Sequence, residues 1–194
     1  SGVGKTTIGK RLASELNLDF FSSGLLYRVI ALHIEKTNTF NLHEFQIVSS
    51  DPVVCKIDAN VYEEKNLYTP QINTKSSEIA QLSEIRMIVS NVLQSIYDNS
   101  NAGLVVEGRD MGSVVFKNAK LKIYLDASEV TRSERRIAQS GNKESVKDLR
   151  ARDSRDINRK ISPLIIPADA IVINNENKSI DEVINIIKEN LKLQ

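Results

Sequence analysis

The chain of 194 residues has one cysteine, two histidines, no long apolar run and almost no net charge. A single cysteine, Cys55, cannot form a disulfide within the chain. Neither histidine, His33 or His43, is close to it in the sequence, so we expect no zinc site. No segment approaches the roughly 18 consecutive apolar residues of a membrane-spanning helix, and no charged and then apolar leader opens the chain. We therefore expect a soluble, cytoplasmic protein that does not bind membranes.

The net charge of +1 hides an uneven distribution of charged residues. Residues 132–160 contain ten Lys and Arg against five Asp and Glu. Such a basic stretch can bind nucleic acid or close over a polyphosphate. It contains no aromatic residue on which a base could stack, which argues against nucleic acid as a partner.

The first residues, Ser1-Gly2-Val3-Gly4-Lys5-Thr6-Thr7, match the second half of the phosphate-binding loop G-x-x-x-x-G-K-[ST]. In such loops glycines let successive backbone N–H groups face phosphate oxygens, and the following helix adds the positive end of its dipole. Lys5 would then bridge the β- and γ-phosphates of ATP, and the Thr6 hydroxyl would bind Mg²⁺. We expect the first glycine of the pattern, and the strand that feeds the loop, to precede Ser1.

Hydrophobic periodicity predicts an α/β protein. Short apolar runs at 103–106, 121–125 and 170–173 indicate buried strands. Apolar residues spaced three and four apart predict five helices: over 5–16, from 23 onward, from 79 to about 99, over 128–139 and over 180–191. Strands separated by helices imply a parallel sheet with helices on both faces. Residues 37–76 hold polar runs and two short candidate strands, 53–57 and 60–62, and are interpreted as an insertion.

Three charged segments accompany the loop. In the first, a glycine turn opens a helix that carries Arg28. In the second, residues 107–112 (EGRDMG) follow a predicted strand, so Arg109 and Asp110 are expected at the sheet edge where ligands bind. In the third, Arg152, Arg155 and Arg159 are three and four residues apart and are predicted to share one helical face. Guanidinium groups suit phosphoryl oxygens, although a helix with surface ion pairs remains an alternative for the third segment.

These segments resemble the bacterial cytidylate kinases, which are P-loop nucleoside monophosphate kinases. The similarity lies in SGVGKTT, SSGLLYR, EGRDMGSVVF, LKIYLDAS, RARDSRDINR and SPLIIPADA, in order over nearly the whole chain. It implies a P-loop kinase core over 1–36 and 77–194, a short lid at about 140–160 and a nucleoside monophosphate-binding insertion over 37–76. It also implies phosphorylation of CMP and dCMP by ATP with Mg²⁺, in a monomer.

The resemblance implies a role for each matching residue. The expected catalytic residues are Lys5, Arg155 and Arg159. The expected ATP contacts are Gly2, Gly4, Lys5, Thr6 and Thr7, with Thr6 as the Mg²⁺ ligand. The expected CMP contacts are Ser23, Arg28, Ser77, Arg86, Arg109, Asp110, Arg152, Asp156 and Arg159, of which Ser77, Arg86 and Asp110 would meet the cytosine ring.

Some positions depart from the family pattern. Ser22 and Glu107 stand where the family usually has Asp, and Tyr68 stands where an Arg is expected. The lid and the insertion are also shorter. Another small P-loop kinase, similar to adenylate or shikimate kinases, and a non-catalytic nucleotide-binding module remain as alternative functions.

Overall fold

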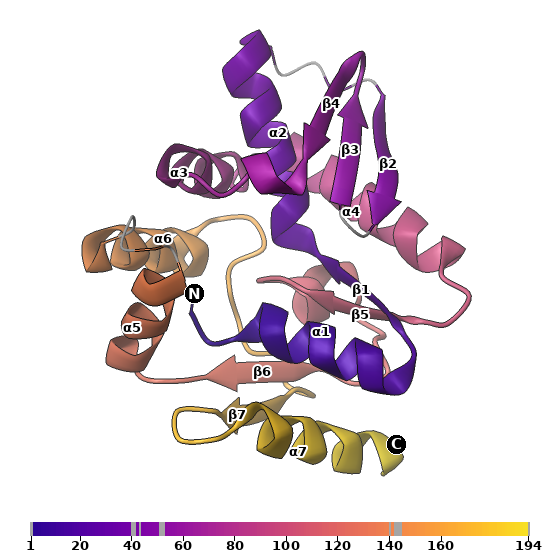
Figure 1. Ribbon diagram of the computed structural model, residues 1–194, viewed down its shortest axis with the longest axis vertical. Coiled ribbons are helices and arrows are strands. Elements are labelled where there is room, and N and C mark those ends of the chain that lie inside the picture. Colours follow the sequence, from indigo (N-terminus) through magenta and orange to yellow (C-terminus); the bar gives the residue numbers. More distant parts are fainter. Residues whose placement is uncertain are drawn as a thin grey trace. The chain divides into compact units, whose positions relative to one another are not determined.

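The computed structural model of the chain describes residues 2–39, 42, 44–50, 53–139, 141 and 145–193 (Figure 1). The chain forms a mixed α/β structure of two compact units, Ser1–Phe20 with Ala102–Gln194, and Phe21–Asn101. Part of the predicted lid, at residues 140 and 142–144, lies outside the described residues. Among the helices that the structure describes, none combines the length and the apolar character that crossing a membrane requires.

The first unit contains parallel strands flanked by helices. Its elements are α1 (Lys5–Leu16), β5 (Leu104–Glu107), β6 (Ile123–Asp126), α5 (Glu129–Gln139), α6 (Val146–Asn158), β7 (Ile171–Asn174) and α7 (Ile180–Lys192). Strands β6 and β7 pair in parallel, from Ile123 opposite Ile171 to Asp126 opposite Asn174. Strand β1 (Asp19–Ser22), at the boundary of the units, pairs with β5. The predicted parallel pairing is confirmed for β6 and β7.

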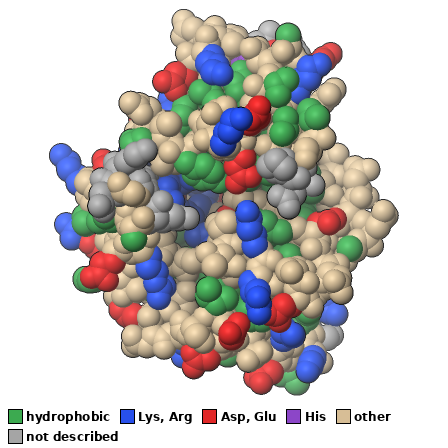
Figure 2. Space-filling view, in the orientation of Figure 1, with side chains coloured by type: hydrophobic (Ala, Val, Ile, Leu, Met, Phe, Trp, Pro, Cys, Tyr) green, Lys and Arg blue, Asp and Glu red, His purple; other side chains and the backbone are tan. Residues whose placement is uncertain are grey.

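Helices α1 and α7 pack against each other beside the β6–β7 pair (Figure 1). Their apolar residues recur every three or four positions, which places them on one face of each helix. Ile8 and Leu12 of α1 meet Val183, Ile184 and Ile187 of α7 in a buried cluster that also includes a β7 residue, Ile173. The outer surface carries both signs of charge (Figure 2), and there Glu15 accepts from Arg11 at 2.7 Å and from Lys188 at 3.1 Å.

The second unit combines helices with an antiparallel sheet. Its elements are α2 (Ser23–Thr37), β2 (Phe45–Ser50), β3 (Val53–Ile57), β4 (Asn60–Glu63), a 3-10 turn (Glu64–Asn66), α3 (Pro70–Ile79) and α4 (Ser83–Asn99). Strand β3 pairs with both β2 and β4. Helix α2 packs against α3 and α4. Ten of its fifteen residues are buried, which makes α2 the central element of this unit.

Most predicted elements are confirmed to within about two residues at each end. Four elements were not predicted separately: β2, the 3-10 turn at Glu64–Asn66, α3 and a π-helical turn at Met111–Val115. The prediction of a helix starting at 79 is wrong at its first turn, because Ile79 is the last residue of α3 and α4 starts at Ser83. Pro70 was interpreted only as part of an irregular insertion. It is the first residue of α3, where proline is tolerated, and the Thr69 side chain caps that helix by accepting from the Ile72 amide at 3.2 Å.

The single cysteine lies in the core of the second unit. Cys55 is fully buried on β3, and this burial raises the pKa of its thiol to about 12. His33 is buried as well and shares a hydrogen bond of 2.8 Å with the Tyr62 hydroxyl through its Nδ1 atom. His33 is therefore part of the packed interior of this unit.

We expect this buried thiol to resist labelling and to make the protein less stable at alkaline pH. The pKa of a thiol in the unfolded chain is about 8.5, so the folded state retains the proton more strongly above that pH. Below about pH 8.5 the thiol is protonated in both the folded and the unfolded state, and the free energy of unfolding does not change with pH on its account. Above about pH 8.5 only the unfolded state loses the proton, and the free energy of unfolding falls by up to about 1.4 kcal/mol per pH unit. Denaturant titrations at pH 8 and pH 10 measure this loss, which Cys55→Ala should reduce. Reaction of the native protein with a thiol reagent at the rate of the unfolded chain would contradict the assignment.

Candidate functional site

The residues after Ser1 form a turn that only glycine accommodates. Gly2 and Gly4 have φ angles of 77° and 82°, in the left-handed region. A Cβ atom on Gly2 would lie 2.2 Å from the Arg132 carbonyl oxygen, so that position also lacks space for a side chain. Helix α1 begins directly after Gly4 with no side-chain cap on its first amides. Free amides at a helix N-terminus after a glycine turn are the features of an anion site.

Lys5, the first residue of α1, lies in a positively charged environment. Removal of its ammonium group from water, and then repulsion by the Arg109 guanidinium, lower the pKa of Lys5 to about 7. Arg152 acts in the same direction, and Glu107 and Asp153 oppose it. Arg109 and Arg152 therefore both repel the Lys5 ammonium group, and an anionic ligand would offset this repulsion.

Thr6 meets a carboxylate from the end of strand β5. Its hydroxyl donates to Glu107 Oε1 at 2.7 Å. A hydroxyl and a carboxylate side by side are oxygen ligands of the type Mg²⁺ prefers, completed by water and phosphate oxygens. The residues here therefore fit a magnesium ion bound together with a nucleotide. Within the described residues, no group of three or more His, Cys, Asp or Glu side chains is arranged to hold a metal ion. Thr7 is exposed in the first turn of α1.

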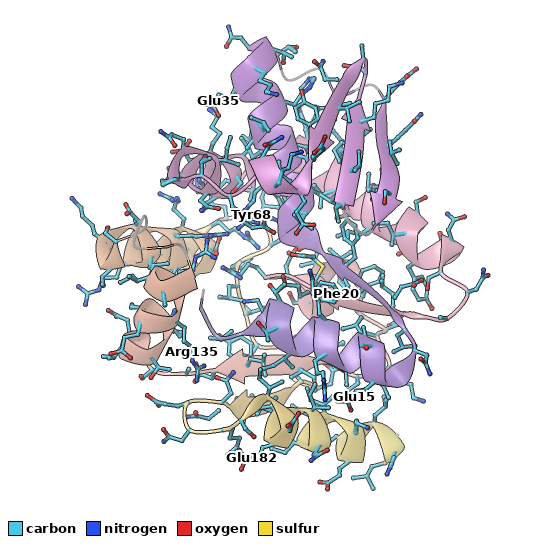
Figure 3. All side chains as sticks on the ribbon, viewed as in Figure 1. Glu15, Phe20, Glu35, Tyr68, Arg135 and Glu182 are labelled. Atoms are coloured by element: carbon cyan, nitrogen blue, oxygen red, sulfur yellow. The ribbon has the colours of Figure 1, made fainter. Side chains whose placement is uncertain are left out.

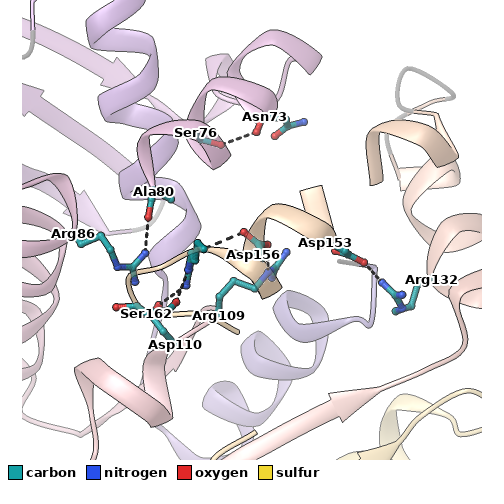
Figure 4. Close-up of polar contacts among 11 residues, drawn as sticks. Asn73, Ser76, Ala80, Arg86, Arg109, Asp110, Arg132, Asp153, Asp156 and Ser162 are labelled. Carbon is teal, nitrogen blue, oxygen red and sulfur yellow. Dashed lines mark hydrogen bonds and ion pairs between the residues drawn. The ribbon is translucent and has the colours of Figure 1, made fainter. Parts of the chain in front are cut away.

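The half-buried Arg109 and three buried residues, Asp156, Arg159 and Asp110, form a chain of alternating charges near the end of β5 and the end of α6 (Figure 4). Arg109 Nε donates to Asp156 Oδ2 at 2.7 Å. Arg159 lies between two carboxylates, with Nη1 at 3.8 Å from Asp156 Oδ1 and Nη2 at 3.7 Å from Asp110 Oδ1. Burial opposes ionisation of Asp156, but the neighbouring guanidinium groups, with Arg109 contributing most, together outweigh it and lower the pKa of Asp156. The structure thus brings together four of the residues expected in the site.

Helix α6 carries the remaining predicted arginines of this unit. A capping box at its start joins the Ser145 side chain to the Asp148 amide and Asp148 back to the Ser145 backbone. Arg152 and Arg155 are half-buried on the helix. The predicted helical face ends before Arg159, which follows the last helical residue with an extended ψ of 141° and donates through Nε to the Ser162 carbonyl. This turn brings the Arg159 side chain to Asp110.

In the second unit, Arg28 is held from three directions. Its Nη1 donates to the Gly24 carbonyl at 2.8 Å, and its Nε donates to Asn73 Oδ1 at 3.0 Å. The Tyr68 ring, labelled in Figure 3, lies 5.0 Å from the guanidinium carbon, a distance typical of a cation–π contact. We call Gly24, Tyr68 and Asn73 the Arg28 clamp. It fixes the guanidinium of a buried arginine in one orientation.

The other predicted residues of the second unit are also buried. Ser23 is the first residue of α2, and Ser77 lies on α3. Arg86 on α4 donates through Nη1 to the Ala80 carbonyl at 2.9 Å (Figure 4). Its guanidinium carbon lies 5.7 Å from the centre of the Tyr27 ring.

Sequence reasoning did not assign a role to two residues that the structure places against predicted site residues. Glu107 was noted only as a departure from the family pattern, yet it accepts from Thr6. Asn73 carries no local signal, because its contact with Arg28 joins residues 45 positions apart in the sequence. Only the fold brings these pairs together.

Comparison with known proteins agrees with this geometry. The family model described as cytidylate kinase matches residues 1–193. A protein of Thermosipho africanus named cytidylate kinase is 33% identical, covering 97% of this chain and 90% of its own length. One of Mycoplasmoides gallisepticum with the same name is 36% identical, covering 96% and 88%.

A solved structure described as an uncharacterized protein from Eubacterium ventriosum supports the fold. It is 15% identical, with a TM-score of 0.52, and the match covers all of this chain and 94% of that chain. A likeness at this identity concerns the fold alone. The full-length family match and relatives above 30% identity carry the assignment: the chain belongs to the cytidylate kinase family.

Proposed function

We propose that this protein transfers the γ-phosphoryl group of ATP to CMP and dCMP, producing ADP with CDP or dCDP. The observation that carries the proposal is that one unit contains both a phosphate-binding loop and the chain of alternating charges formed by Arg109, Asp156, Arg159 and Asp110. The loop suits a polyphosphate donor, and the arginines suit a second phosphate. The cytidine base follows from the family.

For ATP, the proposed contacts are the loop glycines, the Lys5 ammonium group and the hydroxyls of Thr6 and Thr7. Lys5 has the environment this role requires, because an anion would offset the repulsion from Arg109 and Arg152. Thr6 and Glu107 are the residues that would hold Mg²⁺. When bound, that ion neutralises charge on the β- and γ-phosphates.

For the acceptor nucleotide, the proposed contacts are those that membership of the family implies. In the second unit, the Ser23 and Arg28 side chains are assigned to the CMP phosphate, and Ser77 and Arg86 to cytosine. In the first unit, Arg109 is assigned to the phosphate, Asp110 to the amino group of cytosine, and Arg152 and Asp156 to the ribose. Arg155 and Arg159 are assigned to the transferring phosphoryl group.

The reaction requires no protein nucleophile. An oxygen of the CMP phosphate attacks the γ-phosphorus of ATP, a new P–O bond forms, and the bond to the β-phosphate oxygen breaks to release ADP. Catalysis then depends on alignment and on positive charge where negative charge builds up. The arginines at 109, 155 and 159 supply that charge permanently. Lys5, whose pKa is lowered to about 7, adds its charge when it is protonated, and a bound phosphate favours that form.

The remaining elements fit the same proposal. The segment at about 140–160 is proposed as a lid that excludes water during transfer, and 37–76 as the nucleoside monophosphate-binding insertion. We propose a cytoplasmic monomer.

A coupled ADP-release assay with CMP, dCMP, UMP, AMP and shikimate as acceptors tests the function. We expect turnover with CMP and dCMP only. Turnover with AMP or shikimate instead would replace the proposal by one of the other kinase activities. A folded protein that binds ATP but is silent with every acceptor would favour a non-catalytic nucleotide-binding module.

The Arg28 clamp gives a separate prediction about CMP binding. Asn73→Ala removes the acceptor of Arg28 Nε, so the guanidinium should lose its fixed orientation. We expect the KM for CMP to rise about tenfold with little change in kcat, because the contact is present in both the ground state and the transition state. Steady-state kinetics with varied CMP at saturating ATP measure both constants.

Two control variants make this prediction specific. Asn99→Ala removes an exposed asparagine of the same unit whose amide contacts only its own helix in the described structure, and its KM should remain at the wild-type value. Tyr68→Phe keeps the aromatic ring and should behave like the wild type, whereas Tyr68→Ala should raise the KM. Equal KM values for Asn73→Ala and Asn99→Ala would refute a role for the clamp.

A further inference from the structure

The buried residue Asn175, directly after strand β7, joins three parts of the first unit. Its Nδ2 atom donates to the Val3 carbonyl at 2.6 Å, across 172 positions of sequence. Its backbone amide donates to the Asp126 carbonyl at the end of β6, at 2.9 Å. Arg135 of α5, labelled in Figure 3, donates to Asn175 Oδ1 at 3.2 Å and to the Asn175 carbonyl at 3.1 Å. Asn175 is only 4% exposed, so water does not replace these bonds.

Arg135 determines which end of the Asn175 amide faces the phosphate loop. A guanidinium group has only donors, so it must meet the amide oxygen. The NH₂ end is thereby directed to the Val3 carbonyl. A third bond from Arg135, to the Glu176 carbonyl at 3.2 Å, holds the guanidinium in place.

The bond to Val3 also fixes the direction of the next amide. The Val3 carbonyl and the Gly4 N–H belong to one planar peptide unit and point in opposite directions. Anchoring the oxygen to Asn175 therefore aims the Gly4 N–H away from Asn175 and prevents rotation of the peptide plane. Gly4 has the backbone freedom for such a rotation, because its φ is positive and nothing lies closer than 3.7 Å to the position of a Cβ atom.

We propose that Asn175 is a positioning residue for ATP: it presets the Gly4 amide of the phosphate loop, with Arg135 fixing the orientation of its side chain. This inference rests on the proposed function in that the loop is taken to bind the phosphates of ATP. Asn175 itself contacts the backbone of the loop and not the substrate.

The matched substitutions are Asn175→Asp and Asn174→Asp. The first keeps the shape and the oxygen that meets Arg135, but places an oxygen opposite the Val3 carbonyl. We expect the KM for ATP to rise about tenfold to a hundredfold, the range in which a misplaced group affects a reaction, with the KM for CMP unchanged. The second makes the same chemical change one residue earlier. Asn174 accepts from the Glu176 amide at 2.9 Å through its oxygen, which Asp retains, so this variant should match the wild type.

Binding measured without turnover separates this inference from the proposed function. Calorimetry with Mg²⁺ and a non-hydrolysable ATP analogue should show the same loss for Asn175→Asp and none for Asn174→Asp. If Asn175→Asp does not fold, Arg135→Lys provides the second test. It removes the guanidinium that fixes the orientation of the Asn175 side-chain amide, so the affinity of this variant for the ATP analogue should also fall. Wild-type affinity in the variant that folds, or an equal rise in the KM values for ATP and CMP, would overturn the inference. Absence of CMP turnover in the wild type would instead refute the proposed function.

Discussion

Arg159→Ala should lower kcat by about 10³-fold or more, the effect typical of removing an arginine that stabilises a phosphoryl-transfer transition state. The guanidinium of Arg159 is buried and held by Asp110, Asp156 and the Ser162 carbonyl, so it is already oriented before any ligand arrives. A preorganised charge needs no rearrangement during the reaction. We expect binding of CMP, measured by calorimetry, to be affected much less than kcat.

The burial of Arg159 requires a control for stability. Removing one partner of a buried ion pair costs about 3–5 kcal/mol when it leaves an uncompensated charge, and both Asp110 and Asp156 would lose a neighbour. The thermal midpoint of the variant should therefore be measured, together with Arg159→Lys, which keeps the charge but loses the planar donor group. Arg150→Ala removes an exposed arginine of α6, the helix that ends just before Arg159. Arg150 pairs with Glu129 at 2.6 Å, and its removal should leave kcat unchanged. A loss confined to the KM for CMP would assign Arg159 to binding instead of catalysis.

The sequence predicted the parts of this molecule that local patterns determine. The apolar residues Ile8 and Leu12 recur with helical spacing and do form the buried face of α1. Arg109 and Asp110 follow a short apolar run, and β5 does end beside them, at Glu107. In these cases the signal lies within a few residues of the feature it predicts.

Contacts between distant residues were not predictable in the same way. Asn73 and Asn175 are ordinary polar residues in the sequence, and their roles depend on which carbonyl or guanidinium the fold brings to them. The departure of Arg159 from the helical face has a similar cause, because the chain turns at Ser162, where φ is 49°, and the Leu164 amide returns to the Asp156 carbonyl at 2.8 Å. Helical spacing alone could not show where α6 ends.

Asp110 should make kcat/KM for CMP higher than that for UMP by a factor on the order of 10⁴. Discrimination of this size is expected where the wrong substrate leaves a buried polar group of the enzyme without its hydrogen bond. Cytosine presents an amino donor to a carboxylate, whereas uracil presents a carbonyl oxygen at the same position. The Asp110 carboxylate is 3% exposed, so little water is available to separate the two oxygens. Competition assays with both nucleotides measure the ratio directly.

Asp110→Asn should reduce that ratio, because the amide can donate to the uracil oxygen while it still accepts from cytosine. The change comes mainly from a lower kcat/KM for CMP and a higher one for UMP. Asp169→Asn is the matched control: Asp169 is an exposed carboxylate of the same unit, paired with Lys122 at 2.6 Å, and its substitution should leave the ratio as it is. If the wild type used CMP and UMP equally, or if Asp110→Asn kept the wild-type ratio, base recognition would have to depend on Ser77 and Arg86 without Asp110.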